Sequence, residues 1–241
     1  MDMSAAHGTA SAHGTASEQG TAAEQSEALP AGQKGTFRKP IRIGVLISGS
    51  GSNLQAFIDA IGQGCLDAVI VKVISSRPDA YGLVRAQKAG IPTCALDKDV
   101  FLDPAAANRL IAEELLNAGA EYVVMAGYMR KISEEVLDAF PDRVLNIHPA
   151  LLPSFKGAHA IQDAFAAGVK LTGVTVHFAN AEYDKGPIIA QRGVEVREDE
   201  SLASLEARIH EVEHELYPAT LQLLAEGRIS IDQERKVRIS G

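Results

Sequence analysis

Residues 41–53 read IRIGVLISGSGSN, and this stretch indicates the fold class. Its first seven residues form a nearly continuous apolar run, which is typical of a short β-strand buried on both faces. A glycine–serine loop, Ser48–Asn53, follows directly, and Leu54, Phe57 and Ile58 then recur at helical spacing. This succession of strand, loop and helix predicts an α/β protein with helices packed on a buried sheet.

The alternation of strand and helix continues to residue 147. Apolar runs predict further strands at 69–74, 92–96, 122–125 and 143–147, with helices at 81–90, 104–119 and 133–140 between them. Asp103 and Pro104 mark one helix start. An aspartate side chain can accept a hydrogen bond from a backbone N–H of the first turn, and proline suits the first helical position. Repeated strand–helix units imply right-handed crossovers. We therefore expect a doubly wound, mostly parallel, Rossmann-like sheet.

The pattern changes after residue 147. A long loop at 148–158 leads to a short helix at 159–167, and extended runs follow at 172–178 and 188–196. A long amphipathic helix then begins at Leu202. These segments predict a C-terminal antiparallel addition to the sheet. No change of composition divides residues 39–241, so we predict a single domain there.

Residues 1–38 have a different composition. Within them, residues 6–23 form an imperfect six-residue repeat, AHGTAS, AHGTAS and EQGTAA. Such a segment has no apolar period and buries too little surface to offset the entropy lost on ordering. It also lacks the continuous apolar core of a secretory signal. We predict a disordered, low-complexity tail.

The composition excludes several classes of function. The chain has 241 residues, and its 31 Asp and Glu outnumber its 23 Lys and Arg, which argues against a nucleic-acid partner. It has no run of about 20 apolar residues, so we expect no membrane span. Cys65 and Cys94 are too few for a disulfide framework or a usual zinc site. We expect a cytoplasmic protein with reduced thiols.

The glycine–serine loop is the first of three polar clusters that follow predicted strands. In an open α/β sheet, ligands bind at the carboxyl ends of the strands. Glycines allow close backbone approach, and amides at a helix N-terminus favour an anion. The loop lacks the third glycine of a dinucleotide fingerprint and the Gly-Lys-Ser/Thr of a P-loop. We interpret it as an anion site, with an ordinary tight turn as the alternative.

The other two clusters contain Asn146, His148 and Asp184. The two-residue period of a strand places Asn146 and His148 on the same side, where an amide and an imidazole could stabilise an oxyanion and move a proton. The alternative is that Asn146 and His148 are polar residues that cap the end of the strand and have no catalytic role. Asp184, in the polar loop 179–186, is either a solvated turn residue or a partner of His148. A carboxylate beside a histidine favours its protonated form.

The ordered motifs of the chain closely resemble those of the phosphoribosylglycinamide formyltransferases, a folate-dependent family of purine biosynthesis. These motifs are 47–55 (ISGSGSNLQ), 126–130 (AGYMR), 146–155 (NIHPALLPSF), 177–178 (HF), 184–189 (DKGPII) and 213–218 (EHELYP). The resemblance covers about 41–230. Single motifs are shared with other formyl-folate enzymes, whereas the full ordered set is specific to this family.

The resemblance implies transfer of a formyl group from 10-formyltetrahydrofolate, as cosubstrate, to the amino group of glycinamide ribonucleotide. It implies that Asn146, His148 and Asp184 are catalytic, and that no metal is needed. It further implies that the ribonucleotide is bound by Gly51, Ser52, Asn53 and Glu213, and the folate by Met129, Arg130, Lys131, Ile132 and Asn146. Asn146 and protonated His148 would donate to the formyl oxygen as it becomes negative. We expect a monomer or a homodimer.

Some residues depart from the family pattern or have an open role. The family often has a basic residue near Leu102–Ala105 for folate binding, and this chain has none there, so Lys98 or Arg109 is a candidate replacement. Lys131 stands where the family usually has an apolar residue. Histidines 210 and 214 are four apart on a helix but would need a third ligand to bind a metal. We interpret them as a solvated or packed helix face, and His159 and His177 as structural or site-lining.

Three alternatives remain open. A formyltetrahydrofolate deformylase uses a similar site on water, but that family has a regulatory domain before the catalytic one, which the residues before Ile41 are not expected to form. A formyltransferase acting on aminoacyl-tRNA needs a basic C-terminal domain, whereas this chain is acidic. A non-catalytic folate- or nucleotide-binding module would not require His148.

Overall fold

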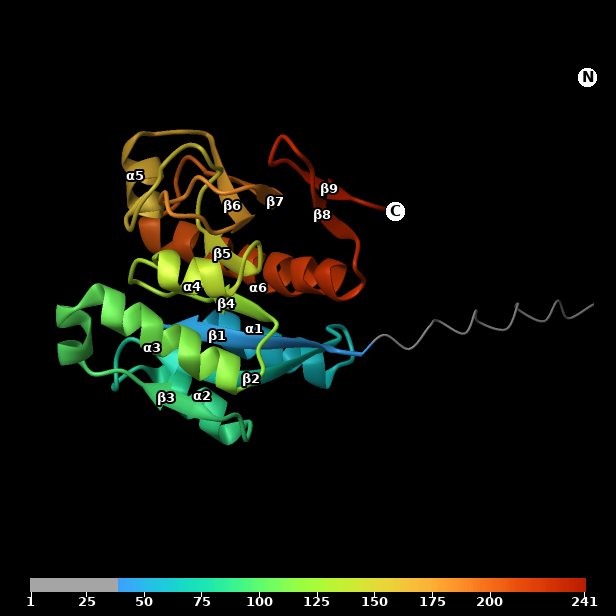
Figure 1. Cartoon of the computed structure of the whole chain (residues 1–241). Coiled ribbons are helices and arrows are strands. Elements are labelled where there is room, and N and C mark those ends of the chain that lie inside the picture. Colours follow the sequence, from blue (N-terminus) through green and yellow to red (C-terminus); the bar gives the residue numbers. More distant parts are fainter. Residues whose placement is uncertain (1–38) are drawn as a thin grey trace, which may run out of the picture. The chain divides into compact units, whose positions relative to one another are not determined.

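Strand β1 (Ile41–Ile47) lies inside a seven-stranded sheet in the computed structural model, which describes residues 39–241. Its side chains are buried on both faces, as the apolar run predicts. The strand order is β3-β2-β1-β4-β5-β6-β7 (Figure 1). The other strands are β2 (Ala68–Ser75), β3 (Thr93–Ala95), β4 (Tyr122–Met125), β5 (Val144–His148), β6 (Leu171–Phe178) and β7 (Ile188–Glu195). The predicted disordered tail, residues 1–38, lies outside the described residues.

The pairing of the strands confirms the predicted fold class. Strands β1 to β5 pair in parallel, and β6 and β7 extend the same sheet in antiparallel fashion. Two further short strands, β8 (Ile229–Ile231) and β9 (Val237–Ile239), form a separate antiparallel hairpin. The sheet is therefore doubly wound and mostly parallel, with antiparallel additions toward the C-terminus.

Helices cover both faces of the sheet. They are α1 (Ser52–Gly62), α2 (Tyr81–Lys88), α3 (Pro104–Asn117), α4 (Glu134–Ala139), α5 (Ala160–Ala166) and α6 (Leu202–Ala225), with a 3-10 helix η1 (Lys98–Leu102). One core cluster joins α1, α2, α5 and α6 to the sheet, and a second joins α3 and α4 to its other face. Successive side chains of β1 alternate between them, so Val45 belongs to the first cluster and Leu46 to the second.

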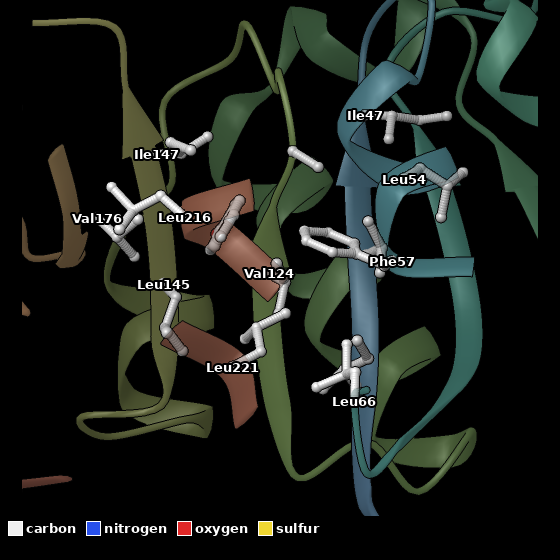
Figure 2. Packing of buried hydrophobic residues seen from close by; sticks show 14 of the residues in the cluster. Ile47, Leu54, Phe57, Leu66, Val124, Leu145, Ile147, Val176, Leu216 and Leu221 are labelled. Carbon is white, nitrogen blue, oxygen red and sulfur yellow. The ribbon is translucent and has the colours of Figure 1, made fainter. Parts of the chain in front are cut away.

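The first core cluster anchors α6 against α1 (Figure 2). The rings of Phe57 and Tyr217 meet edge to face, with their centroids 5.0 Å apart. Both side chains are fully buried, and full burial of one such side chain stabilises the fold by about 1.5–3 kcal/mol. The Tyr217 hydroxyl donates to the carbonyl of Met125 at 3.2 Å. This contact ties α6 to the end of β4, where the candidate site begins.

Glycine 44 explains how α3 packs closely on β1. A Cβ atom at this position would lie 2.3 Å from Cδ2 of Leu115 in α3. A larger residue at position 44 would therefore force the Leu115 side chain of the second core cluster to shift.

The predicted elements agree with the structure in order and type, with differences at their ends. The predicted N-cap of α3 is confirmed, since the Asp103 carboxylate accepts from the backbone N–H of Ala106 at 3.0 Å. Helix η1 and the β8–β9 hairpin were not predicted, because segments this short carry no periodic signal. No helix within residues 39–241 combines the length and the apolar character needed to cross a membrane.

Candidate active site

The glycine–serine loop (Ser48–Asn53) leads from β1 into α1 and is held by α2. The backbone N–H of Gly82 donates to the carbonyl of Gly49 at 3.0 Å, and Arg85 Nε donates to the carbonyl of Ser50 at 2.9 Å. Gly51 caps α1 in the left-handed region, with a φ of 69°. These contacts fix the loop, and the backbone amides of the first turn of α1, which have no partner within the helix, are suited to bind an anion.

This loop forms one wall of a cavity of about 380 Å³, here called the loop cavity. The cavity lies between the ends of β1 and β4, where the strand order reverses direction and where ligands of doubly wound sheets bind. Helix α6 closes another side. The lining residues are Ser48–Asn53, Arg77, Ala126, Gly127, Met129, Ile147, Pro149, His210 and Glu213.

Glu213 is a buried carboxylate in the wall of the loop cavity. It is only 5% exposed, and its Oε2 accepts from Asn53 Nδ2 at 3.0 Å and from His210 Nδ1 at 2.9 Å. The hydrogen bond to Glu213 raises the pKa of His210 above its ordinary value. Oδ1 of Asn53 is buried without a hydrogen-bond partner among residues 39–241. Such an atom is a free acceptor for a ligand N–H or O–H.

His210 and Arg77 in this wall were not predicted as site residues. His210 lies one helical turn before Glu213, so this spacing could have indicated it once Glu213 was implicated. Arg77 follows β2 and is paired with the exposed Asp79, with Nη2 2.6 Å from Oδ2. It adds a positive charge to a cavity whose loop already presents backbone amides.

A second, much smaller cavity, of about 30 Å³, lies beside Asn146 at the ends of β4 and β5, and is here called the Asn146 cavity. It is lined by Met125, Lys131, Ile132, Asn146, His177, Ala179, Asn180, Glu182, Tyr183 and Asp184. A wider side groove, lined by Pro104, Ala105, Lys131, Ser133, Glu134, Glu135 and Ala181, has about 330 Å³ of space. Lys131 lines both spaces, so a ligand that extends from one to the other passes its ammonium group.

The segment after β4 is divided between the two cavities. The predicted folate residues Lys131, Ile132 and Asn146 line the Asn146 cavity, whereas Met129 lines the loop cavity. The backbone N–H of Met129 donates to Ser48 Oγ at 2.8 Å, which joins this segment to the glycine–serine loop. The Arg130 guanidinium stacks over the Phe101 ring, 4.6 Å from its centroid.

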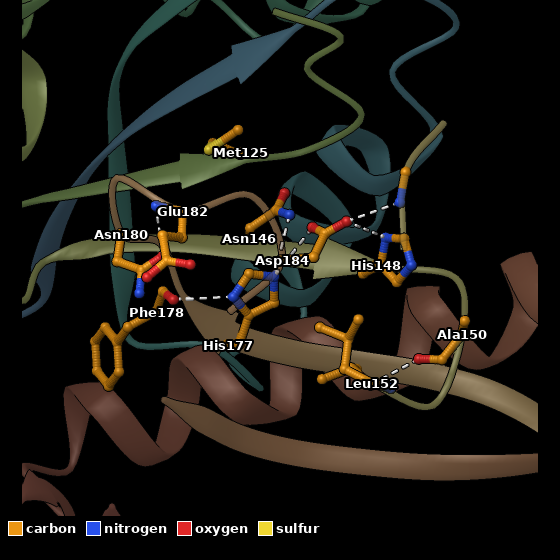
Figure 3. Close-up of polar contacts among 12 residues, drawn as sticks. Met125, Asn146, His148, Ala150, Leu152, His177, Phe178, Asn180, Glu182 and Asp184 are labelled. Carbon is orange, nitrogen blue, oxygen red and sulfur yellow. Dashed lines mark hydrogen bonds and ion pairs between the residues drawn. The ribbon is translucent and has the colours of Figure 1, made fainter. Parts of the chain in front are cut away.

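The structure brings Asn146, His148 and Asp184 together (Figure 3). Nδ1 of His148 is 3.5 Å from Oδ2 of Asp184, and both residues are buried, 4% and 5% exposed. Oδ2 also accepts from the backbone N–H of Gly157 at 3.0 Å. The other ring nitrogen of His148, Nε2, donates to the carbonyl of Phe155 at 2.7 Å. The histidine is therefore held between the carboxylate and the loop that follows β5.

The backbone is unusual at two of these positions. Asp184 has a φ of 53° and Phe155 a φ of 49°, in the left-handed region that side chains other than glycine rarely adopt. Such conformations cost of order 1–3 kcal/mol and persist only where the surroundings impose them. Here they aim the Asp184 carboxylate and the Phe155 carbonyl at the same imidazole.

His177, which the sequence left as structural or site-lining, lies in the same cluster. Its Nε2 is 3.3 Å from Nδ2 of Asn146 and 3.8 Å from Oδ1 of Asp184. Burial lowers the pKa of His177, although the hydrogen bond to the Phe178 carbonyl and the charge of Asp184 oppose this. The cluster thus contains an amide donor, two imidazoles and one carboxylate. These groups can polarise a carbonyl and transfer a proton.

Two predictions about charged groups can be placed in the structure. Within the described part of the chain, no group of three His, Cys, Asp or Glu side chains could hold a metal ion. Of the two candidate replacements for the missing basic residue, Lys98 lies in η1, and Arg109 pairs with Glu135 at 3.7 Å. Glu135 lines the side groove, so Arg109 is close to that space.

The chain resembles known proteins over most of its length. The model of the formyl transferase family matches residues 41–221. A phosphoribosylglycinamide formyltransferase of Bacillus subtilis is 38% identical over 183 residues, which are 76% of this chain and 94% of that protein. The chain is also 40% identical, over 199 residues, to a trifunctional purine biosynthetic protein adenosine-3 of Bos taurus. This match covers 83% of the chain but only 20% of that protein.

Solved structures agree with the sequence comparison. A glycinamide ribonucleotide transformylase 1 of Symbiobacterium toebii superposes with a TM-score of 0.81 at 47% identity, covering 83% of this chain and 94% of that one. A phosphoribosylglycinamide formyltransferase of Anaplasma phagocytophilum gives a TM-score of 0.77 at 39% identity, covering 84% and 96%.

Proposed function

The chain belongs to the formyl transferase family, and from this premise we propose that it transfers the formyl group of 10-formyltetrahydrofolate to the amino group of glycinamide ribonucleotide. This reaction is a step of purine biosynthesis. The names of the similar proteins support the choice of acceptor. The observation that carries the proposal is the position of the loop cavity and the Asn146 cavity, which meet the sheet at the ends of three neighbouring strands, β1, β4 and β5.

The loop cavity is the proposed site of the ribonucleotide. The backbone amides of Gly51, Ser52 and Asn53 would hold its phosphate at the start of α1, and Arg77 adds positive charge. Glu213 would contact the part of the substrate that bears the amine. The free acceptor Oδ1 of Asn53 supports this assignment, because a ribonucleotide offers hydroxyl and amide donors.

The Asn146 cavity is the proposed site of the folate cosubstrate. Its lining combines apolar side chains such as Ile132 with the polar groups of Asn146 and Asp184, which could bond to the edge of a heterocycle. The side groove would take the acidic tail, and Lys131 lies between the two spaces. Met129 and Arg130 belong to the same segment as Lys131 and would hold it in place through their contacts with Ser48 and Phe101.

The proposed chemistry is acyl transfer assisted by three side chains. When the amine of the ribonucleotide attacks the formyl carbon, Asn146 Nδ2 donates to the oxygen that becomes negative. His148 Nε2–H exchanges the Phe155 carbonyl for the same oxygen, while Asp184 supports the positive imidazolium. The attacking nitrogen loses its proton, through a water or Asp184, to the folate nitrogen that leaves. Removal of one oxyanion donor typically costs about 10²–10³-fold in rate.

The proposal also includes the cellular location, oligomeric state and partners of the enzyme. We propose that it acts in the cytoplasm as a monomer or homodimer, without a metal ion and without a nucleic-acid or membrane partner. Cys65 and Cys94, which are both free thiols, support the cytoplasmic location.

One assay tests the proposed function. Purified protein is mixed with 10-formyltetrahydrofolate, with and without glycinamide ribonucleotide, and deformylation of the folate is followed. We expect turnover that requires the ribonucleotide. Equal turnover without it would identify a deformylase. Full activity of His148→Ala would contradict the mechanism, whereas a wild-type protein without turnover would favour a binding module. Asp163→Asn, an exposed change on α5, is a control that should not alter the rate.

A further inference from the structure

His177 is a buried imidazole that contacts the proposed catalytic group but has no part in the chemistry described above. It lies on β6 directly opposite Asn146 on β5, as Cα partners of an antiparallel pair. Residues opposite each other in such a pair point to the same face of the sheet. The side chain is 2% exposed, so its polar atoms must find partners inside the protein.

The partners of His177 determine its tautomer. Nδ1 is 2.9 Å from the backbone carbonyl of Phe178, and a carbonyl can only accept, so Nδ1 carries the hydrogen (Figure 3). Burial lowers the pKa of His177 by more than the charge of Asp184, whose Oδ1 lies 3.8 Å from Nε2, raises it, and this favours the neutral ring. In a neutral ring with a hydrogen on Nδ1, Nε2 is an acceptor.

The acceptor at Nε2 in turn determines how the Asn146 amide is turned. Only the amide NH₂ can donate to Nε2, and Nδ2 lies 3.3 Å away. A reversed amide would place its oxygen against the lone pair of Nε2 and would offer no N–H on that side. With one hydrogen of Nδ2 directed at the ring, the second hydrogen is available to a ligand in the Asn146 cavity.

We propose that His177 is a positioning residue, whose Nδ1-protonated tautomer holds the Asn146 amide in the orientation that presents an N–H to the formyl oxygen. The inference rests on the proposed function, because it assigns Asn146 the role of oxyanion donor. It adds that the donor is oriented from the neighbouring strand, through a hydrogen-bonded chain from the Phe178 carbonyl to His177 to Asn146.

A double-mutant cycle tests this chain of contacts. His177→Leu removes the acceptor at Nε2, and we expect kcat to fall roughly 10- to 100-fold, which is no more than the low end of the cost of removing an oxyanion donor outright. The KM for the ribonucleotide should not change, since His177 does not line the loop cavity. Asn146→Ala should abolish this effect, so the double variant should be no slower than Asn146→Ala alone. Losses that multiply would overturn the proposal.

Conservative variants separate orientation from packing. In His177→Gln, the side-chain carbonyl can reach the position of Nε2 and accept from Asn146, so we expect most of kcat to return. A loss of kcat in His177→Gln as large as that in His177→Leu would contradict the proposal. Gln87→Leu, an exposed polar residue of α2 changed to the same side chain, is the control and should retain the wild-type rate. If His177→Leu does not fold, the glutamine variant still decides between the two outcomes.

A measurement without substrate keeps this proposal separate from the proposed function. Long-range ¹H–¹⁵N spectra of protein labelled at the histidine rings distinguish the two neutral tautomers and the imidazolium. We expect His177 to be neutral with its hydrogen on Nδ1. A hydrogen on Nε2 would overturn the proposal even if the enzyme transfers formyl groups. If the protein proves to be a deformylase, the cycle can be repeated with water as acceptor, because the same formyl oxygen needs the donor.

Discussion

Asn53 and Glu213 are 160 residues apart in the chain, yet Asn53 Nδ2 donates to Glu213 Oε2 at 3.0 Å in the wall of the loop cavity. Asn53 belongs to the start of α1, and Glu213 lies in the long helix α6. The core contact between Phe57 and Tyr217 holds the same two helices together. The proposed substrate site therefore depends on how α1 and α6 pack, and not only on the glycine–serine loop.

Glu213→Gln tests the charge at this contact. Glutamine preserves the volume but leaves no negative charge for His210 or for the amine-bearing part of the ribonucleotide. Hydrogen bonds to charged groups contribute about 1.5–3 kcal/mol, so we expect the KM for the ribonucleotide to rise roughly 10- to 100-fold with little change in the KM for the folate. Steady-state kinetics with each substrate varied in turn measures this.

Glu215→Gln is the matched control for that change. Glu215 lies on the same helix but is exposed and paired with Arg192. Surface ion pairs contribute little, so the control should leave both KM values unchanged. Equal effects of the two substitutions would remove Glu213 from the proposed substrate site.

Gly51→Ala tests the geometry of the glycine–serine loop. A Cβ atom at Gly51 would lie 2.6 Å from Cα of Gly82, and a φ of 69° is unfavourable for alanine. Backbone on both sides cannot move aside, so we expect the free energy of unfolding to fall by about 1 kcal/mol or more, and ribonucleotide binding to weaken. Denaturant unfolding and titration with the ribonucleotide measure the two effects.

Gly62→Ala is the control for this prediction. Gly62 ends α1, its Cβ would meet nothing within 4 Å, and its φ lies outside the left-handed region. Alanine is favoured over glycine in a helix by up to about 1 kcal/mol, so this variant should be as stable as the wild type or more stable. If both alanine variants behave alike, the close approach of Gly51 and Gly82 has no functional importance.

Much of this fold could be predicted from the sequence because its segments have strong periods. Residues 41–47 are apolar on both faces, and the structure buries them on both faces. The hairpin β8–β9 could not be predicted, since three-residue strands show no alternation that differs from a loop. The predicted end of β5 is also one residue short, because His148 is polar and yet continues the strand as part of the buried cluster.

The site was less predictable than the fold because it depends on register and packing. Asn146 and His148 could be placed on one side of a strand from the two-residue period alone. That His177 faces Asn146 follows from the pairing of β5 with β6, which no local pattern specifies. His210 was interpreted as part of a helix face, and its position in the loop cavity depends on how α6 crosses α1.

The pKa of His210 gives a pH-dependent prediction. Its hydrogen bond to Glu213 raises this pKa above the ordinary value of 6.5. Folding therefore favours the protonated form, and the resulting stabilisation is fully present below pH 6.5 and is lost as the pH rises through the folded-state pKa. We expect His210→Gln to remove this dependence, which denaturant unfolding at a series of pH values measures for both proteins.

The same protonation should affect the substrate. Protonated His210 adds a positive charge to the loop cavity, so ribonucleotide affinity in the wild type should fall as the pH rises through the pKa of His210. In His210→Gln, the affinity should lose this component of its pH dependence. An unchanged pH profile in the variant would show that another group is responsible.

Lys131→Gln tests the assignment of the folate site. Lys131 lines both the Asn146 cavity and the side groove, and no ion pair to it is found in the described part of the chain. Its ammonium group is therefore available to a carboxylate of the folate tail, and its loss should raise the KM for the folate severalfold. The KM for the ribonucleotide should not change, because Lys131 does not line the loop cavity. Lys88→Gln, at the exposed end of α2, is the control and should leave both KM values unchanged. If the folate tail follows the side groove, the rise in KM caused by Lys131→Gln should be larger for a folate with additional glutamates.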